Sequence, residues 1–143
     1  MTARHFLALP DLSADELRGL IRRAMTLKQN LHAPDQPDFM RGKTAVLVFE
    51  KSSTRTRVSF ETGIGQCGGN AIFLAPADSH LGRGESLGDT ARVLSRMADL
   101  IIMRTGPHAR LQIMAAHAAV PVCLLYTSPS PRDATLSRMP SSA

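Results

Sequence analysis

Stretches with apolar residues at helical spacing alternate along this chain with short continuous apolar runs, and this pattern predicts helices that alternate with strands. Apolar residues at helical spacing predict a helix over about 14–31, which Ser13 and Glu16 open with the spacing of a capping box. A helix-like stretch follows Arg57 and runs through about Gln66. Similar patterns predict helices over about 86–98, where Ser86 and Asp89 mark the start, and over 108–118. Short continuous apolar runs predict strands over 44–49, 71–75, 100–103 and 120–125, the first of them buried on both faces.

Strands that alternate with helices are typical of a parallel sheet with helices on both of its faces. We therefore predict a three-layer α/β domain with a four-strand parallel sheet. In the third helix we expect one buried face, made of Leu87, Thr90, Ala91, Leu94, Met97 and Ala98. From Tyr126 onward ten of eighteen residues are Ser, Thr or Pro, with no apolar period, so we expect a disordered C-terminal tail.

Composition agrees with one soluble globular domain. The chain has 143 residues, of which 43% are hydrophobic and 20% charged. No apolar run approaches the length of a membrane-spanning helix, and the first residues have no apolar signal segment, so we expect no membrane partner. Cys67 and Cys123 have no metal-site spacing around them, which favours free thiols in a reducing cytoplasm.

The net charge of +5 comes mainly from arginine, which supplies 14 of the 17 basic residues. Arginine is well suited to planar, bidentate binding of phosphate and carboxylate groups. A nucleic-acid surface would require a continuous basic stripe, whereas these arginines are scattered apart from Arg22–Arg23 and the pair Arg55 and Arg57. We therefore expect no nucleic acid as partner.

The densest group of anion-binding side chains is Ser52-Ser-Thr-Arg-Thr-Arg57, between the first strand and the helix after it. Ligands of parallel sheets bind at the carboxyl ends of the strands, and a helix N-terminus binds anions through its unpaired N–H groups. Hydroxyl groups and the Arg55 guanidinium add further donors. The alternative is that Ser52 or Ser53 only caps the helix while the arginines are solvated.

A second motif, Gly63-Ile-Gly-Gln-Cys-Gly68, matches the G-x-G-x-x-G pattern of dinucleotide-binding sites. In those sites the glycines follow a strand and open a helix, whereas here they close a helix and precede a strand. We therefore interpret them as a helix C-cap with close packing.

Two segments resemble a known family. Phe49-Glu-Lys-Ser-Ser-Thr-Arg-Thr-Arg-Val-Ser-Phe-Glu61 is similar to the carbamoyl-phosphate loop of the aspartate and ornithine carbamoyltransferases. Residues 78–97, DSHLGRGESLGDTARVLSRM, resemble the ornithine branch of that family. The resemblance runs from about residue 4 to Val122 and implies transfer of a carbamoyl group to ornithine, giving citrulline in arginine metabolism.

Carried over by position, the resemblance implies that Ser53, Thr54, Arg55 and Thr56 bind the phosphate of carbamoyl phosphate. It also implies that Arg104 contacts both the phosphate and the carbonyl oxygen, with a surface charge beside a turn as the alternative on spacing alone. Arg55, Thr56 and Arg104 are then the candidate catalytic residues.

Other polar residues near these motifs have weaker claims. Arg57 is expected to pair with Glu61, one helical turn on. His80 stands where the family has glutamine, on a loop implied to reach a neighbouring subunit, and is a further candidate ligand or else an exposed loop histidine. His108 and His117 are interpreted as ordinary helix residues.

The implied reaction needs neither a metal nor an organic cofactor. An amine attacks the carbonyl carbon, fixed donors stabilise the developing oxyanion, and positive charge stabilises the departing phosphate. The family forms homotrimers through this domain, so the resemblance implies a homotrimer for the full-length protein. It also implies a His-Pro-Cys-Gln segment and a second domain, neither of which is present here.

We therefore interpret residues 1–122 as an incomplete carbamoyl-phosphate-binding domain and 123–143 as a tail foreign to the family. The tail begins with the last residues of a strand. On this hypothesis the chain is a truncated or misassembled copy with little or no turnover of its own. An aspartate carbamoyltransferase-type enzyme, a non-catalytic phosphate-binding module and a nucleic-acid binder remain as alternatives.

Overall fold

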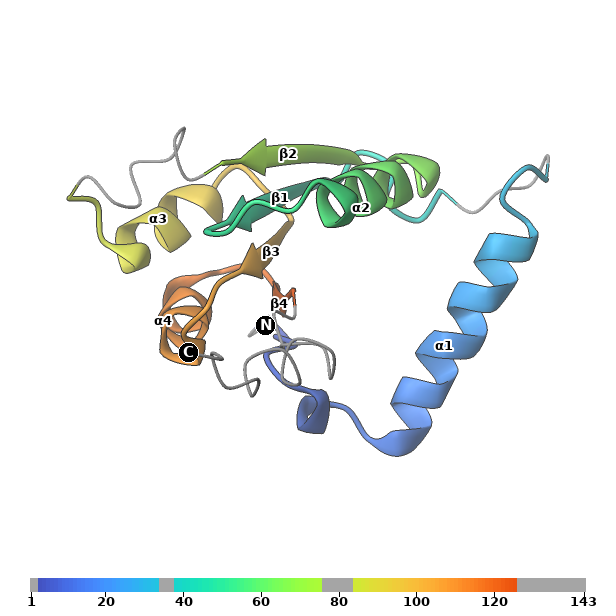
Figure 1. Ribbon diagram of the computed structural model, residues 1–143, viewed down its shortest axis with the longest axis horizontal. Coiled ribbons are helices and arrows are strands. Elements are labelled where there is room, and N and C mark those ends of the chain that lie inside the picture. The colour runs from blue at the N-terminus through green and yellow to red at the C-terminus, as the bar shows by residue number, and fades with distance from the viewer. Residues whose placement is uncertain (1–2, 34–37, 76–83, 126–143) are drawn as a thin grey trace, which may run out of the picture.

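The centre of the protein is a parallel sheet, and it is known from a computed structural model that describes residues 3–33, 38–75 and 84–125. Its four strands are β1 (Thr44–Phe49), β2 (Asn70–Leu74), β3 (Leu100–Arg104) and β4 (Val122–Leu124). Their order in space is β2-β1-β3-β4, and every pairing is parallel (Figure 1). Five of the six residues of β1 are buried, as the continuous apolar run predicted.

Helices cover both faces of this sheet. Helix α2 (Thr54–Gln66) contributes Ile64 to a cluster with Ala45, Leu47, Phe49 and Ile102 on one face. The opposite face carries α3 (Leu87–Leu94) and α4 (His108–His117), whose side chains pack on Val46, Val48 and Met103. The alternation of inward and outward side chains along β1 and β3 produces these two clusters. The predicted three-layer α/β architecture is confirmed.

Helix α1 (Ala14–Gln29) differs from the other helices because none of its residues is buried. The Ser13 hydroxyl accepts a hydrogen bond from the Glu16 N–H, and the Glu16 carboxylate accepts one from the Ser13 N–H, so the predicted capping box is present. Figure 1 shows α1 standing away from the layered part of the molecule. Its apolar residues Leu20, Ile21 and Met25 are each more than half exposed.

Most predicted elements agree with the observed ones to within two residues, but α2 begins earlier than expected, at Thr54, and the third helix is shorter than expected. It ends at Leu94 and is followed by a turn, so Met97 is 67% exposed instead of facing the core. The prediction for Met97 was therefore wrong, because the helical period no longer applies once the helix has ended. The other members of that face are buried as predicted. The predicted disorder from Tyr126 onward lies outside the described residues.

Candidate functional site at the carboxyl ends of β1 and β3

The two central strands of the sheet, β1 and β3, end side by side. From β1 the chain passes through α2 to β2 on one side, and later returns to β3 on the other side. The connections after β1 and β3 therefore diverge to opposite faces at the carboxyl ends of these strands. In open α/β sheets this topological switch point is where ligands bind. Residues 50–56 and 104–107 flank it.

The start of α2 presents free hydrogen-bond donors at this switch point. Ser53 occupies the N-cap position with extended backbone (φ −160°, ψ 99°), but its side chain makes no capping hydrogen bond. The first turn of α2 contains no acidic residue. Nothing on α2 itself therefore neutralises its first N–H groups or the positive end of its dipole, and both remain available to an anion.

The predicted phosphate-binding side chains surround this helix end. The Ser53 hydroxyl donates a hydrogen bond to the Thr56 hydroxyl at 2.8 Å, so these two oxygens are held together. Arg55 is exposed, and among the described residues its guanidinium has no hydrogen bond or ion pair. The alternative that Ser53 only caps the helix does not match this geometry, since its hydroxyl bonds to a side chain instead. Arg55 is solvated, as that alternative also expects.

Arg104 reaches the same loop from the end of β3. Its Nη1 donates hydrogen bonds to the backbone oxygens of Lys51 and Ser52, at 3.1 and 2.8 Å. These bonds place a guanidinium beside the residues that precede the α2 N-terminus. Of the predicted residues, the structure thus brings together Ser53, Thr54, Arg55, Thr56 and Arg104, whereas His80 lies outside the described residues.

The Arg57 guanidinium binds Glu61 and Phe73 rather than contributing to the α2 N-terminus. Its Nε donates to the Glu61 carboxylate at 3.0 Å, which confirms the predicted pair, and its guanidinium lies 3.9 Å from the centre of the Phe73 ring. This side chain therefore joins α2 to β2 and is already occupied by two partners.

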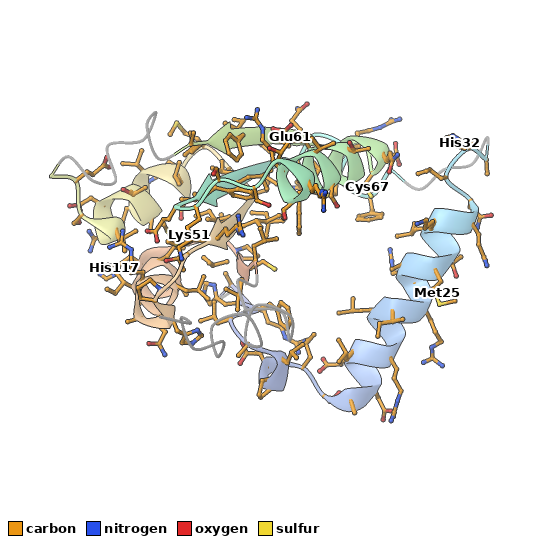
Figure 2. All side chains as sticks on the ribbon, in the orientation of Figure 1. Met25, His32, Lys51, Glu61, Cys67 and His117 are labelled. Carbon is orange, nitrogen blue, oxygen red and sulfur yellow. The ribbon has the colours of Figure 1, made fainter. Side chains whose placement is uncertain are left out.

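Two residues of this edge were missed by sequence reasoning. Glu50 is bound by Thr105 and Arg110, and Lys51 lies against the loop after β3, where a Cβ on Gly106 would be 3.8 Å from the Lys51 Nζ. Figure 2 labels Lys51 at the end of β1, beside α4. The available signal was their position directly after a strand and before the phosphate loop, but their partners are more than fifty residues away in sequence.

The other motifs have the structural roles that were predicted. Gly68 has φ +83°, and a Cβ there would meet Asp38 Cβ at 2.9 Å, so the G-x-G-x-x-G motif closes α2 and packs tightly. Both cysteines are free thiols, and burial raises the pKa of Cys123. Within the described ranges no three His, Cys, Asp or Glu residues could hold a metal ion, and no helix is long and apolar enough to cross a membrane.

Comparisons with known proteins agree with this geometry. Residues 4–129 match the family model described as "Aspartate/ornithine carbamoyltransferase, carbamoyl-P binding domain". The chain belongs to this family. It is 52% identical over 122 residues to the ornithine carbamoyltransferase of Psychrobacter arcticus, and 54% identical over 124 residues to that of Chromohalobacter salexigens. Each match covers 85% of this chain and 40% of the relative, so the chain spans about two fifths of these carbamoyltransferases.

Solved structures of the family have the same fold. The ornithine carbamoyltransferase of Pyrococcus furiosus superposes with a TM-score of 0.80 at 39% identity, covering 86% of this chain and 39% of that one. The catalytic subunit of the aspartate transcarbamoylase of M. jannaschii superposes with a TM-score of 0.76 at 30% identity, covering 85% and 40%. The match to the carbamoyl-phosphate-binding domain spans every described strand and helix.

Proposed function

We propose that the switch point at the carboxyl ends of β1 and β3 binds carbamoyl phosphate, with its phosphate at the start of α2. The uncapped N-terminus of α2 is the single observation that carries this proposal, because it leaves N–H donors and a positive dipole end for an anion. Arg55 lies in the first turn of that helix, and Arg104 enters from the neighbouring strand. The family to which the chain belongs supports the identity of the ligand.

In the full-length enzyme we propose that the bound carbamoyl group is transferred to an amine. The neutral amine nitrogen attacks the carbonyl carbon, the bond from that carbon to the phosphate oxygen breaks, and the amine loses a proton. Arg55 and the α2 amides would stabilise the departing phosphate, while Arg104 and Thr56 would donate to the carbonyl oxygen as it gains charge. Because no covalent intermediate is required, positioning of the reactants supplies much of the rate.

We propose ornithine as the acceptor amine, with citrulline and phosphate as products. The curated relatives described above are ornithine carbamoyltransferases at 52% and 54% identity, against 30% for the aspartate transcarbamoylase subunit. Incubating the full-length protein with carbamoyl phosphate and either amino acid separates the two. Citrulline formation would support ornithine, a carbamoylated aspartate would overturn that choice, and phosphate binding without either product would indicate a non-catalytic module.

The ligand assignment is tested on this chain by calorimetric titration with carbamoyl phosphate. Arg55→Ala removes an exposed guanidinium and should weaken binding at least about tenfold, because a charge-assisted contact is worth about 1.5–3 kcal/mol. Arg41→Ala is the matched control, since Arg41 is an exposed arginine preceding β1, at the opposite edge of the sheet, paired with Asp38. Equal affinities of the Arg55→Ala variant and the parent would remove this loop from the site.

The alternative of a nucleic-acid binder makes a different prediction. Binding of DNA through basic side chains would weaken steeply as the salt concentration rises. A tight, salt-dependent complex with DNA, together with no response to carbamoyl phosphate, would favour that alternative over the proposed enzyme.

A further inference from the structure

Glu50, the first residue after β1, connects three parts of the site edge. Its Oε1 accepts a hydrogen bond from the Arg110 Nε at 2.6 Å, and its Oε2 accepts one from the Thr105 hydroxyl. Its own N–H donates to the Arg104 backbone oxygen at 2.9 Å. The Glu50 side chain is only 20% exposed and Thr105 is almost fully buried, so these bonds are partly shielded from water.

The loop after β3 makes the reciprocal connection. Arg104, adjacent to Thr105 in sequence, donates to the backbone oxygens of Lys51 and Ser52, which directly follow Glu50. The side chain of Glu50, after β1, therefore binds the loop that follows β3, and the side chain of Arg104, at the end of β3, binds the loop that follows β1. The Arg104 guanidinium can reach Lys51 and Ser52 only if the turn over 104–107 keeps its place. The Glu50 carboxylate anchors that turn at Thr105 and at the first turn of α4.

We propose that Glu50 is a positioning residue for anion binding, acting through Thr105 and Arg110 on the placement of Arg104. This inference rests on the proposed function, because it assigns Arg104 to the bound carbamoyl phosphate. A carboxylate so close to an anion site would repel the ligand if it were unpaired. Arg110 neutralises it, so Glu50 can anchor the loop while the net positive charge of Arg55 and Arg104 remains for the ligand.

A double-mutant cycle separates positioning from general stabilisation. Glu50→Gln keeps the shape of the side chain but removes the charge that accepts from Arg110. We expect it to weaken binding of inorganic phosphate, the product of the proposed reaction, about tenfold in calorimetric titration. In the Arg104→Ala background the same substitution should change the affinity less than about twofold, because the residue that Glu50 positions is then absent.

Asp99→Asn is the matched control for this experiment. The Asp99 carboxylate links the start of β3 to Lys43 and to the Thr44 N–H, at the opposite edge of the sheet. It makes the same kind of connection between the same two strands, so a merely structural effect should appear in both variants. Arg110→Gln breaks the same ion pair from the side of the arginine. If Glu50→Gln folds poorly, Arg110→Gln provides the test in its place, and it should show the same loss of phosphate affinity.

A readout without ligand distinguishes failure of this inference from failure of the proposed function. In the unliganded protein, the side-chain NMR signals of Arg104 should shift or broaden in Glu50→Gln and stay unchanged in Asp99→Asn. If these signals respond but the parent chain binds no phosphate, the proposed function is wrong, while the placement of Arg104 by Glu50 stands. Unchanged Arg104 signals, or an equal loss of affinity in both backgrounds of the cycle, would overturn the inference.

Discussion

Replacing Ser53 by aspartate should make this domain more stable while it destroys the proposed anion site. Ser53 already has the extended backbone of an N-cap residue, yet its hydroxyl bonds to Thr56 and leaves the first N–H groups of α2 unpaired. A carboxylate in the same place can accept from those N–H groups. It thus forms the capping hydrogen bonds that the Ser53 side chain does not make, and it occupies the N–H donors that the phosphate would use.

The expected gain in stability has two parts. A good N-cap contributes about 1 kcal/mol, and a negative charge at the positive end of the helix dipole contributes about 0.5 kcal/mol. With an unfolding entropy of about 2 cal/mol/K per residue, the sum of about 1.5 kcal/mol raises Tm by about 5 °C. For the ligand, two like charges about 4 Å apart repel by about 4 kcal/mol at an effective dielectric constant of 20. We therefore expect at least about a 100-fold loss of phosphate affinity.

Differential scanning calorimetry with and without phosphate measures both effects. Phosphate at 100 times the parent's dissociation constant should stabilise the parent chain by about 2.7 kcal/mol and the Ser53→Asp variant by no more than about 0.4 kcal/mol. Ser53→Ala removes the hydroxyl without adding a cap, so its stability should stay within about 0.5 kcal/mol of the parent. The reasoning would be refuted by an aspartate variant that melts below the parent, or by one that gains as much stability from phosphate as the parent does.

Two further predictions concern the framework that carries the site. The Thr44 N–H and the Lys43 ammonium hold the pKa of Asp99 below its ordinary value of 3.8, so the stability from this carboxylate is present above about pH 4 and lost as the pH falls through the lowered pKa. In urea unfolding, Asp99→Asn should be less stable than the parent at pH 7, and the difference should shrink below pH 4; a constant difference would contradict this. Gly69→Ala places a Cβ 2.9 Å from Met40 Cβ and 3.1 Å from Ile64 Cγ2, and should destabilise the fold by about 1–3 kcal/mol. In the control Gly65→Ala, no atom of the described residues outside the helix's own backbone lies within 4 Å of the new methyl, so it should stabilise α2 by up to about 1 kcal/mol. Equal melting temperatures for the two variants would count against the packing argument.

Local patterns were sufficient for most of the fold. Continuous apolar runs identified four parallel strands, and the Ser13–Glu16 and Ser86–Asp89 spacings marked two helix starts where the expected capping bonds are found. These signals depend only on near neighbours in the chain, which is why they can be read without tertiary contacts. The same patterns did not indicate that α1 buries none of its apolar face, because the packing partner of a helix is not a local property.

The candidate site divides in the same way. Ser53, Thr54, Arg55 and Thr56 were found from one short segment, whose hydroxyl and guanidinium groups precede and open a helix. Their assignment to carbamoyl phosphate, and that of His80 and of the domain boundary at residue 122, stay predictions. Arg104 was proposed from its place at a strand end and from the resemblance, and the structure puts it in hydrogen-bond contact with the loop.

Sequence by itself determined the alternation of helices and strands, the donor-rich start of α2 and membership of the carbamoyltransferase family. Each of these depends on residues that lie close together in the chain. Only the tertiary structure decided that β1 and β3 are neighbours, and therefore that Glu50 meets Thr105 and Arg110 while Arg104 meets Lys51 and Ser52. Strand order depends on which apolar faces bury each other best, a comparison over the whole domain that no single segment contains.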